Sequence, residues 1–96
     1  MDVDFASIYN RHERAVQDTV LERCGLYPAL AADADLLADV ACVALNRLPA
    51  RYIRHHADYA FYLTEREAAA DAAAVAQAVQ DAFEFVQARA ALREQA

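Results

Sequence analysis

The chain has 96 residues, a formal net charge of −6 and a single glycine. This length makes one domain, and the scarcity of glycine disfavours an all-β fold, which needs many tight turns. The acidity disfavours general binding to DNA or membrane phosphates, and no stretch resembles a membrane span or a signal peptide, so we expect a soluble, cytoplasmic protein.

The first helix is expected to run from about Ile8 to Cys24. Apolar residues recur there at helical spacing, at Ile8, Ala15, Val16, Val20 and Cys24. Residues 1–7 precede this pattern and are expected to be a poorly ordered lead-in.

A loop is expected over residues 25–35. Gly25 is a candidate C-terminal cap for the first helix, and Pro28 is a stop signal just beyond it. The loop ends in Asp33 and Asp35, either of which can cap the next helix.

The second helix, from about Leu36 to Leu48, is the most hydrophobic element. Its apolar residues cover more than one stripe: Leu37, Val40, Ala41, Ala44, Leu45 and Leu48. We therefore expect it to be central, with Leu45 and Leu48 fully buried. Pro49 disfavours helical geometry at the preceding residue and ends the helix.

The last helix is expected to begin at a capping box, Thr64–Glu67, and to be long and rich in alanine. Before it, the sequence RYI is compatible with a short extended piece, and ADYAFYL with a helical turn or an aromatic-lined loop. A heptad-like seam runs along the helix at Ala68, Ala72, Val75, Val79, Ala82 and Val86. This seam can pack within the chain or meet a second copy, and Phe85 on another side favours a dimer.

These elements predict an all-α fold of three to four helices with a long C-terminal helix. Residues 1–96 are expected to form a single domain, and two copies of the chain are expected to form a homodimer. A chain this short buries only about 60–65% of its unfolded surface, so assembly is a natural supplement to its core.

Catalytic chemistry has few candidates in this chain. Ser7 is the one serine, the two threonines fall in helix or cap positions, and one glycine cannot form a phosphate-binding loop. We expect no enzymatic activity and no cofactor. Cys24 and Cys42 are expected to be buried, reduced thiols, and the three histidines lack the i, i+4 pairing of metal ligands, so no metal is expected either.

Arginines gather in the run from Arg47 to His56, which contains Arg51 and Arg54 and no acid. Guanidinium groups bind phosphates and guanine edges, and the neighbouring Tyr52 and Tyr62 can stack on bases. We expect these arginines to meet at one anion site. An ordinary solvated surface is the alternative reading.

The run DVACVALNRLPARY, residues 39–52, resembles the signature of the late-competence ComFB family, of the type D-V/I-x-A-x-ALN-x-LP-P-x-Y. An upstream N-x-x-E-x-x-V pattern is matched by Asn10, Glu13 and Val16. The resemblance covers roughly residues 8–88. Two departures are Ala50 in place of a frequent second proline, and the lack of a full counterpart to the cysteines that bind zinc in some members.

The resemblance implies a small, mostly helical, dimeric receptor for cyclic di-GMP, in a family tied to competence, motility and pili. It highlights Asn10, Glu13, Asp39, Asn46, Pro49, Arg51 and Tyr52. All but Arg51 have a structural alternative: Asn46 capping its helix, Asp39 pairing with Arg14 or Arg11, Pro49 ending the helix, Tyr52 lying in the core, and Asn10 and Glu13 bracing the loop after Pro49.

The sequence therefore predicts a receptor that binds a cyclic dinucleotide and passes the signal to an unknown protein partner. The residues expected at the ligand are Arg47, Arg51, Arg54, Tyr52, Asn46, Arg14 and Tyr62. The rival reading is an interaction module whose arginines meet an acidic protein surface, and nucleic-acid binding comes third.

Overall fold

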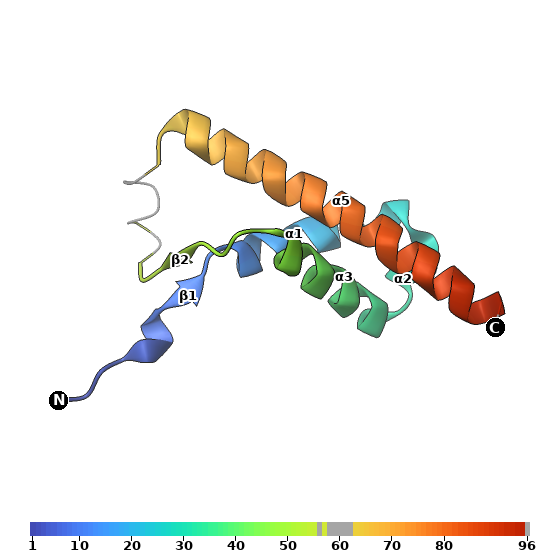
Figure 1. The fold of residues 1–96 in the computed structure, drawn as a ribbon, viewed down its shortest axis with the longest axis horizontal. Helices are drawn as coiled ribbons and strands as arrows, with labels where there is room; N and C mark the ends of the chain where they lie inside the picture. The colour runs from blue at the N-terminus through green and yellow to red at the C-terminus, as the bar shows by residue number, and fades with distance from the viewer. Residues whose placement is uncertain (56, 58–62, 96) are drawn as a thin grey trace.

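Helix α5, Glu65–Gln95, lies across α1, His12–Arg23, and α3, Ala34–Arg47 (Figure 1). The computed structural model describes residues 1–55, 57 and 63–95. The remaining elements are short: η1 Phe5–Ser7, β1 Tyr9–Asn10, η2 Cys24–Leu26, α2 Pro28–Ala31 and β2 Tyr52–Ile53. The predicted helical fold with a long C-terminal helix is confirmed.

The core lies where the three long helices meet. Val16 of α1, Val40 of α3 and Val79 of α5 are fully buried together with Leu30 of α2. Phe83 of α5 is also fully buried, and its ring stacks on Tyr27 with the centroids 4.4 Å apart. The short helix α2 and Tyr27 just before it therefore pack onto the core.

Helix α1 begins four residues later than the apolar pattern predicted. The segment before it is extended, because Tyr9 pairs with Ile53 and Asn10 with Tyr52 in an antiparallel register. Ile8 is consequently 45% exposed and lies outside the helix. Residues 1–7, expected to be poorly ordered, contain the short helix η1.

The chain between α1 and α3 also differs from the expected loop. Gly25 has no positive φ and continues the chain as the 3-10 turn η2, so it is not a left-handed cap. Pro28 begins α2, where a missing amide proton costs nothing, and does not act as a stop. The cap at Asp33 is confirmed, since its Oδ1 accepts the Asp35 and Leu36 amides at 2.9 and 3.3 Å.

Helix α3 ends before Pro49 as predicted, but its burial is uneven. Val40 and Ala44 are fully buried, whereas Leu45 and Leu48 are only half-buried, so the prediction for these two leucines was wrong. The other elements cover one side of α3, and its remaining apolar surface is left at the edge of the core. The predicted burial of Cys42 is also wrong: the side chain is exposed, and Cys24 is half-buried.

Helix α5 begins at the predicted capping box: Thr64 Oγ1 accepts the Glu67 amide at 3.1 Å, and Glu67 Oε2 accepts the Thr64 amide at 3.2 Å. Its seam packs inside the chain from Val75 to Val86, which are buried, whereas Ala68 and Ala72 are exposed. The buried part of the seam is therefore unavailable to a second copy.

None of the helices that the structure describes is long and apolar enough to cross a membrane.

Candidate functional site

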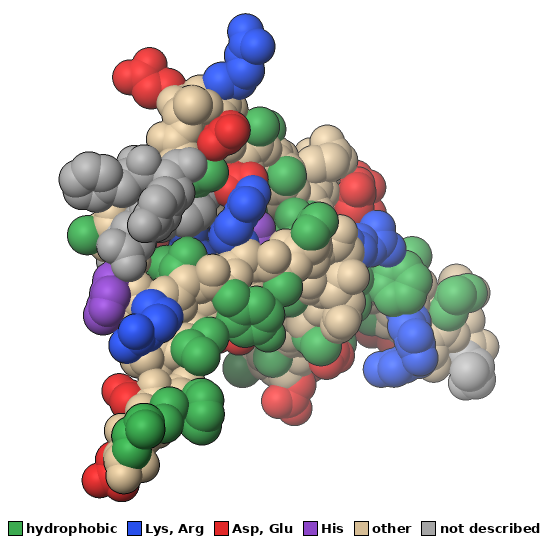
Figure 2. Space-filling model, turned by 60° about the vertical axis from the view of Figure 1, so that its left-hand side comes forward, with side chains coloured by type: hydrophobic (Ala, Val, Ile, Leu, Met, Phe, Trp, Pro, Cys, Tyr) green, Lys and Arg blue, Asp and Glu red, His purple; other side chains and the backbone are tan. Residues whose placement is uncertain are grey.

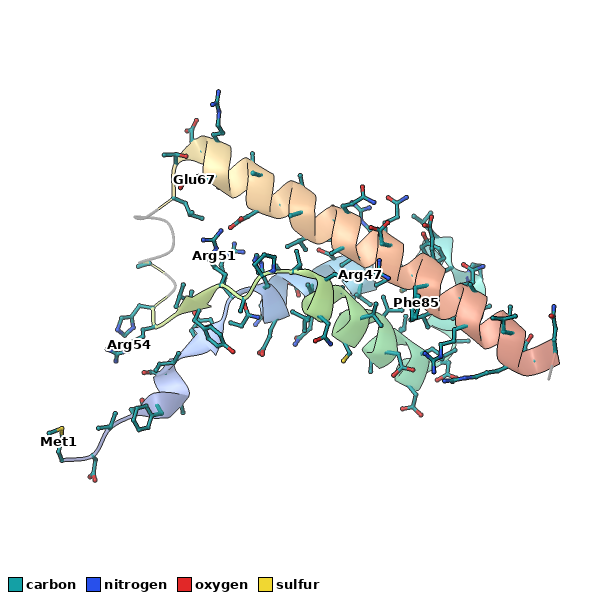
Figure 3. All side chains as sticks on the ribbon, viewed as in Figure 1. Met1, Arg47, Arg51, Arg54, Glu67 and Phe85 are labelled. Atoms are coloured by element: carbon teal, nitrogen blue, oxygen red, sulfur yellow. The ribbon has the colours of Figure 1, made fainter. Side chains whose placement is uncertain are left out.

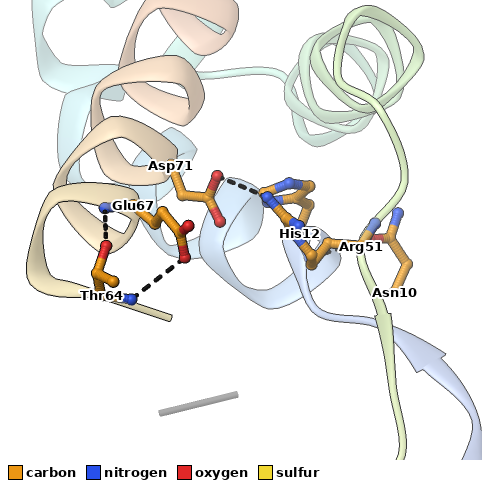
Figure 4. A network of polar contacts seen from close by, with 6 residues as sticks. All are labelled: Asn10, His12, Arg51, Thr64, Glu67 and Asp71. Carbon is orange, nitrogen blue, oxygen red and sulfur yellow. Dashed lines mark hydrogen bonds and ion pairs between the residues drawn. The ribbon is translucent and has the colours of Figure 1, made fainter. Parts of the chain in front are cut away.

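The Asn10 side chain fixes the segment after Pro49 against the start of α1 (Figure 4). Its Oδ1 accepts the His12 amide at 3.1 Å and the Arg51 amide at 3.0 Å. The Arg11 amide in turn donates to the Arg51 carbonyl at 2.8 Å. One side-chain oxygen thus joins two segments 41 residues apart in the sequence.

The Arg51 side chain connects this junction to α5. Its Nη2 lies 3.0 Å from Asp71 Oδ1 (Figure 4). The Asp71 side chain is 16% exposed and that of Arg51 is 46% exposed, so the pair is only partly removed from solvent. Arg51 is therefore held in position while one side of its guanidinium stays accessible.

His12 is the buried titratable group of the junction. Its side chain is 3% exposed, and Nδ1 has no hydrogen-bond partner among the described residues. Burial lowers the pKa of His12 below its ordinary 6.5, and Arg51 and Arg11 lower it further, while Asp71 opposes the shift. The imidazole is thus neutral at pH 7, and the accessible positive charge here belongs to arginine.

Alternation along β2 gives Arg51 and Tyr52 different directions. Tyr52 is 67% exposed. Arg54 is exposed as well, and its Nε donates to Ser7 Oγ at 3.2 Å. Figure 2, which brings this end of the molecule forward, shows arginine, histidine and hydrophobic side chains next to one another on the surface.

An open cavity of about 530 Å³ lies between β2 and the first turns of α5. Its lining includes Arg51, Tyr52 and Ile53 from the strand, and Glu67 and Asp71 from the helix. The volume falls in the range of small-molecule sites. A guanidinium and a phenol at its edge can bind an anion and an aromatic ring, while the two carboxylates repel a phosphate that enters more deeply.

The family follows from comparison with known proteins. The family model described as "Late competence development protein ComFB" matches residues 9–90. The chain belongs to this family. Membership suggests a competence-related role. No curated protein and no solved structure matches the chain.

Arg47 lies apart from Arg51 and Arg54, the other two arginines of the run from Arg47 to His56 (Figure 3). It occupies the last turn of α3, and its guanidinium carbon is 5.6 Å from the ring centroid of Phe85 on α5. The chain becomes extended at Leu48, and each extended residue advances it by about 3.3 Å. The expectation that Arg47, Arg51 and Arg54 meet in one place is therefore wrong for a single protomer.

Three further residues of the predicted ComFB site are distributed around the fold. Asn46 Nδ2 donates to the Cys42 carbonyl at 3.0 Å, which supports the end of α3, as the structural alternative proposed. Arg14 pairs with Asp18 at 3.6 Å on the exposed face of α1, beside a second open cavity of about 770 Å³. Tyr62 lies outside the described residues.

The other residues highlighted by the resemblance are also placed. Asn10 braces the loop after Pro49, as its structural alternative proposed. Glu13 is exposed beside the cavity next to Arg14. Asp39 is exposed on α3, and Arg14 pairs with Asp18 and not with it.

Asp71 is the member of the junction that sequence reasoning missed. A signal for it was present, because Asp71 lies four residues before the buried Val75, on the stripe of α5 that turns inward. An acid at such a position usually has a cationic partner, but nothing in the sequence identifies that partner as Arg51.

Proposed function

We propose that this ComFB family member is a non-enzymatic, homodimeric receptor that binds a cyclic dinucleotide, with cyclic di-GMP as the first candidate. The observation that carries the proposal is the order of side chains on the braced segment that contains β2: Arg51, the exposed Tyr52 and the exposed Arg54. Guanidinium groups pair with phosphate oxygens and guanine edges, and an exposed phenol ring offers a stacking surface.

The brace at Asn10 supports this proposal. A binding strand of two residues has little pairing of its own, and its backbone is instead fixed by hydrogen bonds to Asn10 and Arg11. Positioning the backbone before binding lowers the ordering cost that a ligand must overcome. We place the ligand at the edge of β2 beside the cavity, where Tyr52 and Arg54 lie on the outer face and Arg51 reaches the ligand from the cavity side, with Glu67 and Asp71 behind it.

The proposed contacts are Arg51, Tyr52 and Arg54, with Arg14 on the neighbouring face of α1. Arg47 and Asn46 lie on α3 and are not included. The Arg47 guanidinium lies over the Phe85 ring, and the Asn46 side chain bonds to the Cys42 carbonyl near the end of the helix. A cyclic dinucleotide has two phosphates and two bases, so a two-fold dimer supplies two equivalent sets of these side chains.

Isothermal calorimetry with a panel of cyclic dinucleotides tests the proposal, and sedimentation at micromolar concentration tests the dimer. We expect binding of at least one member of the panel, with cyclic di-GMP strongest, by a protein of twice the chain mass. Absence of binding across the whole panel would rule out the receptor function. It would favour the rival reading, an interaction module whose arginines bind an acidic partner.

The signal would then pass to a protein partner in competence, motility or pilus processes. This downstream step rests on family membership, which suggests the competence-related role.

A further inference from the structure

A groove runs between α3 and the C-terminal half of α5, away from the braced strand. Its volume is about 270 Å³. Leu36 and Val43 of α3 and Phe85 of α5 form its apolar part, and Arg89 and Arg93 lie along one edge.

The apolar part of the groove remains accessible. Phe85 is 44% exposed, and Leu36 and Val43 are half-buried against the core. Leu92, 67% exposed, follows Phe85 by seven residues and therefore lies on the same stripe of α5. Large apolar side chains that form a contiguous exposed patch mark interaction sites more often than single ones do.

The charge around the groove is opposite to that of the protein. Arg47 extends over the Phe85 ring from α3, with its guanidinium carbon 5.6 Å from the centroid (Figure 3). Arg89 and Arg93 line the groove from α5, and Asp39 is the one acid among its described lining residues. Among the lining residues, two arginines against one aspartate leave a local charge of about +1, and Arg47 beside the groove adds a further positive charge, on a protein whose formal net charge is −6.

We propose that this groove binds an acidic amphipathic helix of a partner protein. Apolar side chains of that helix would occupy the space over Phe85, and flanking Glu or Asp side chains would pair with Arg89, Arg93 and Arg47. A groove between two helices accepts the side-chain ridge of a third, which is a recurrent mode of helix recognition.

The same charges disfavour a second copy of the chain as the occupant. In a two-fold interface centred on this groove, each patch meets its own equivalent. Two patches of the same positive net charge would then meet, and like charges across an interface cost affinity. This surface goes beyond nucleotide binding, because it gives the chemical class of partner and uses none of the proposed nucleotide contacts.

Two designed peptides test the proposal by fluorescence anisotropy on the full chain. Both have about 18 residues, or about five helical turns, and the same leucine stripe. Glu flanks the stripe in one peptide and Lys replaces every Glu in the other. We expect the Glu peptide to bind at least about tenfold more tightly than the Lys peptide, since opposite charges at the rim attract and like charges repel.

Three variants locate the binding to the groove. The double variant Arg89→Glu/Arg93→Glu should reverse the preference between the two peptides, and Phe85→Ala should weaken both. Arg66→Glu, a charge reversal at another exposed arginine near the start of α5, is the control and should leave the preference unchanged. Circular dichroism melts confirm that each variant folds.

Equal affinity for the two peptides, or an Arg89→Glu/Arg93→Glu variant with the wild-type preference, would overturn the proposal. So would a change of oligomeric state in that variant, because a second copy would then be the occupant. Cyclic di-GMP titrations of the same variants test the nucleotide site separately. Because none of these substitutions changes a proposed nucleotide contact, the helix-binding proposal and the receptor proposal can each fail without affecting the other.

Discussion

Arg51 and Asp71 form an ion pair that ties the short strand β2 to the longest helix, with 3.0 Å between Nη2 and Oδ1. The same guanidinium is a proposed ligand contact. A phosphate that binds Arg51 must therefore share it with a carboxylate already in place, and this competition leads to the first two predictions.

Replacing Arg51 or Arg54 with alanine should weaken cyclic di-GMP binding by about ten- to a hundredfold, since a charge-assisted contact contributes about 1.5–3 kcal/mol. Calorimetric titration measures the loss. Arg89→Ala is the control and should bind like the wild type, because Arg89 lies in the groove at the other end of α5. Unchanged affinity in both the Arg51 and the Arg54 variant would show that β2 is not the nucleotide site.

Asp71→Asn should strengthen binding about two- to fivefold, which corresponds to removing a partly exposed ion-pair competitor worth about 0.5–1 kcal/mol. The same titration measures the gain. Asp81→Asn, on the same helix and bonded to Gln77 at 2.9 Å, is the matched control. Weaker binding by Asp71→Asn would mean that Asp71 positions Arg51 for the ligand and does not compete with it.

Phe83→Ala should destabilise the fold by about 3–5 kcal/mol, as large-to-small changes at fully buried aromatic positions do. Its ring is fully buried and stacks on Tyr27. Phe85→Ala, two residues later and 44% exposed, should lose less than about 1 kcal/mol. Urea unfolding compares the two variants, and similar losses would contradict the placement of the core.

Asn10→Ala removes the acceptor of two backbone amides and should lower the free energy of unfolding by about 1–3 kcal/mol. Asn46→Ala, which removes exposed bonds from one amide group to the carbonyl and Sγ of Cys42, should change it by less than about 0.5 kcal/mol. Urea unfolding again provides the measurement. A stable Asn10 variant that still binds nucleotide with full affinity would show that the brace is dispensable.

The pH dependence of stability should contain a contribution from His12. Its pKa is lowered from 6.5 in the folded state, so the unfolded chain binds the proton more readily. The contribution of neutral His12 to stability is therefore fully present above pH 6.5 and is lost as the pH drops below that value. The loss levels off once the pH is below the pKa of His12 in the folded protein. Chemical unfolding from about pH 7.5 to about 5.5 should show this fall in the wild type and a smaller one in His12→Gln. An equal fall in the two proteins would mean that His12 is not its source.

Local signals made much of the fold predictable. The cap at Asp33, the capping box Thr64–Glu67 and the stop at Pro49 each depend on residues within a few positions of one another, and all three were confirmed. The ComFB resemblance also pointed to Asn10 and Arg51 before their contact was known.

The features that were missed depend on distant segments. Ile8 fits a helical pattern by itself, yet pairing of β1 with β2 keeps this segment extended. Leu45 fits a buried stripe, but only the position of the other helices decides which side of α3 they cover. The contact from Arg51 to Asp71 spans 20 residues, and no periodicity in the sequence encodes it.

The length of α5 has a spatial consequence. Asp71 contacts Arg51 next to β2 and Arg93 lines the groove, and their separation of 22 positions corresponds to about 33 Å of helix. Between these two points Val75, Val79, Phe83 and Val86 bury one side of the helix in the core. One continuous helix therefore keeps the nucleotide contacts and the groove about 33 Å apart, so a ligand at one and a partner helix at the other would not compete for space.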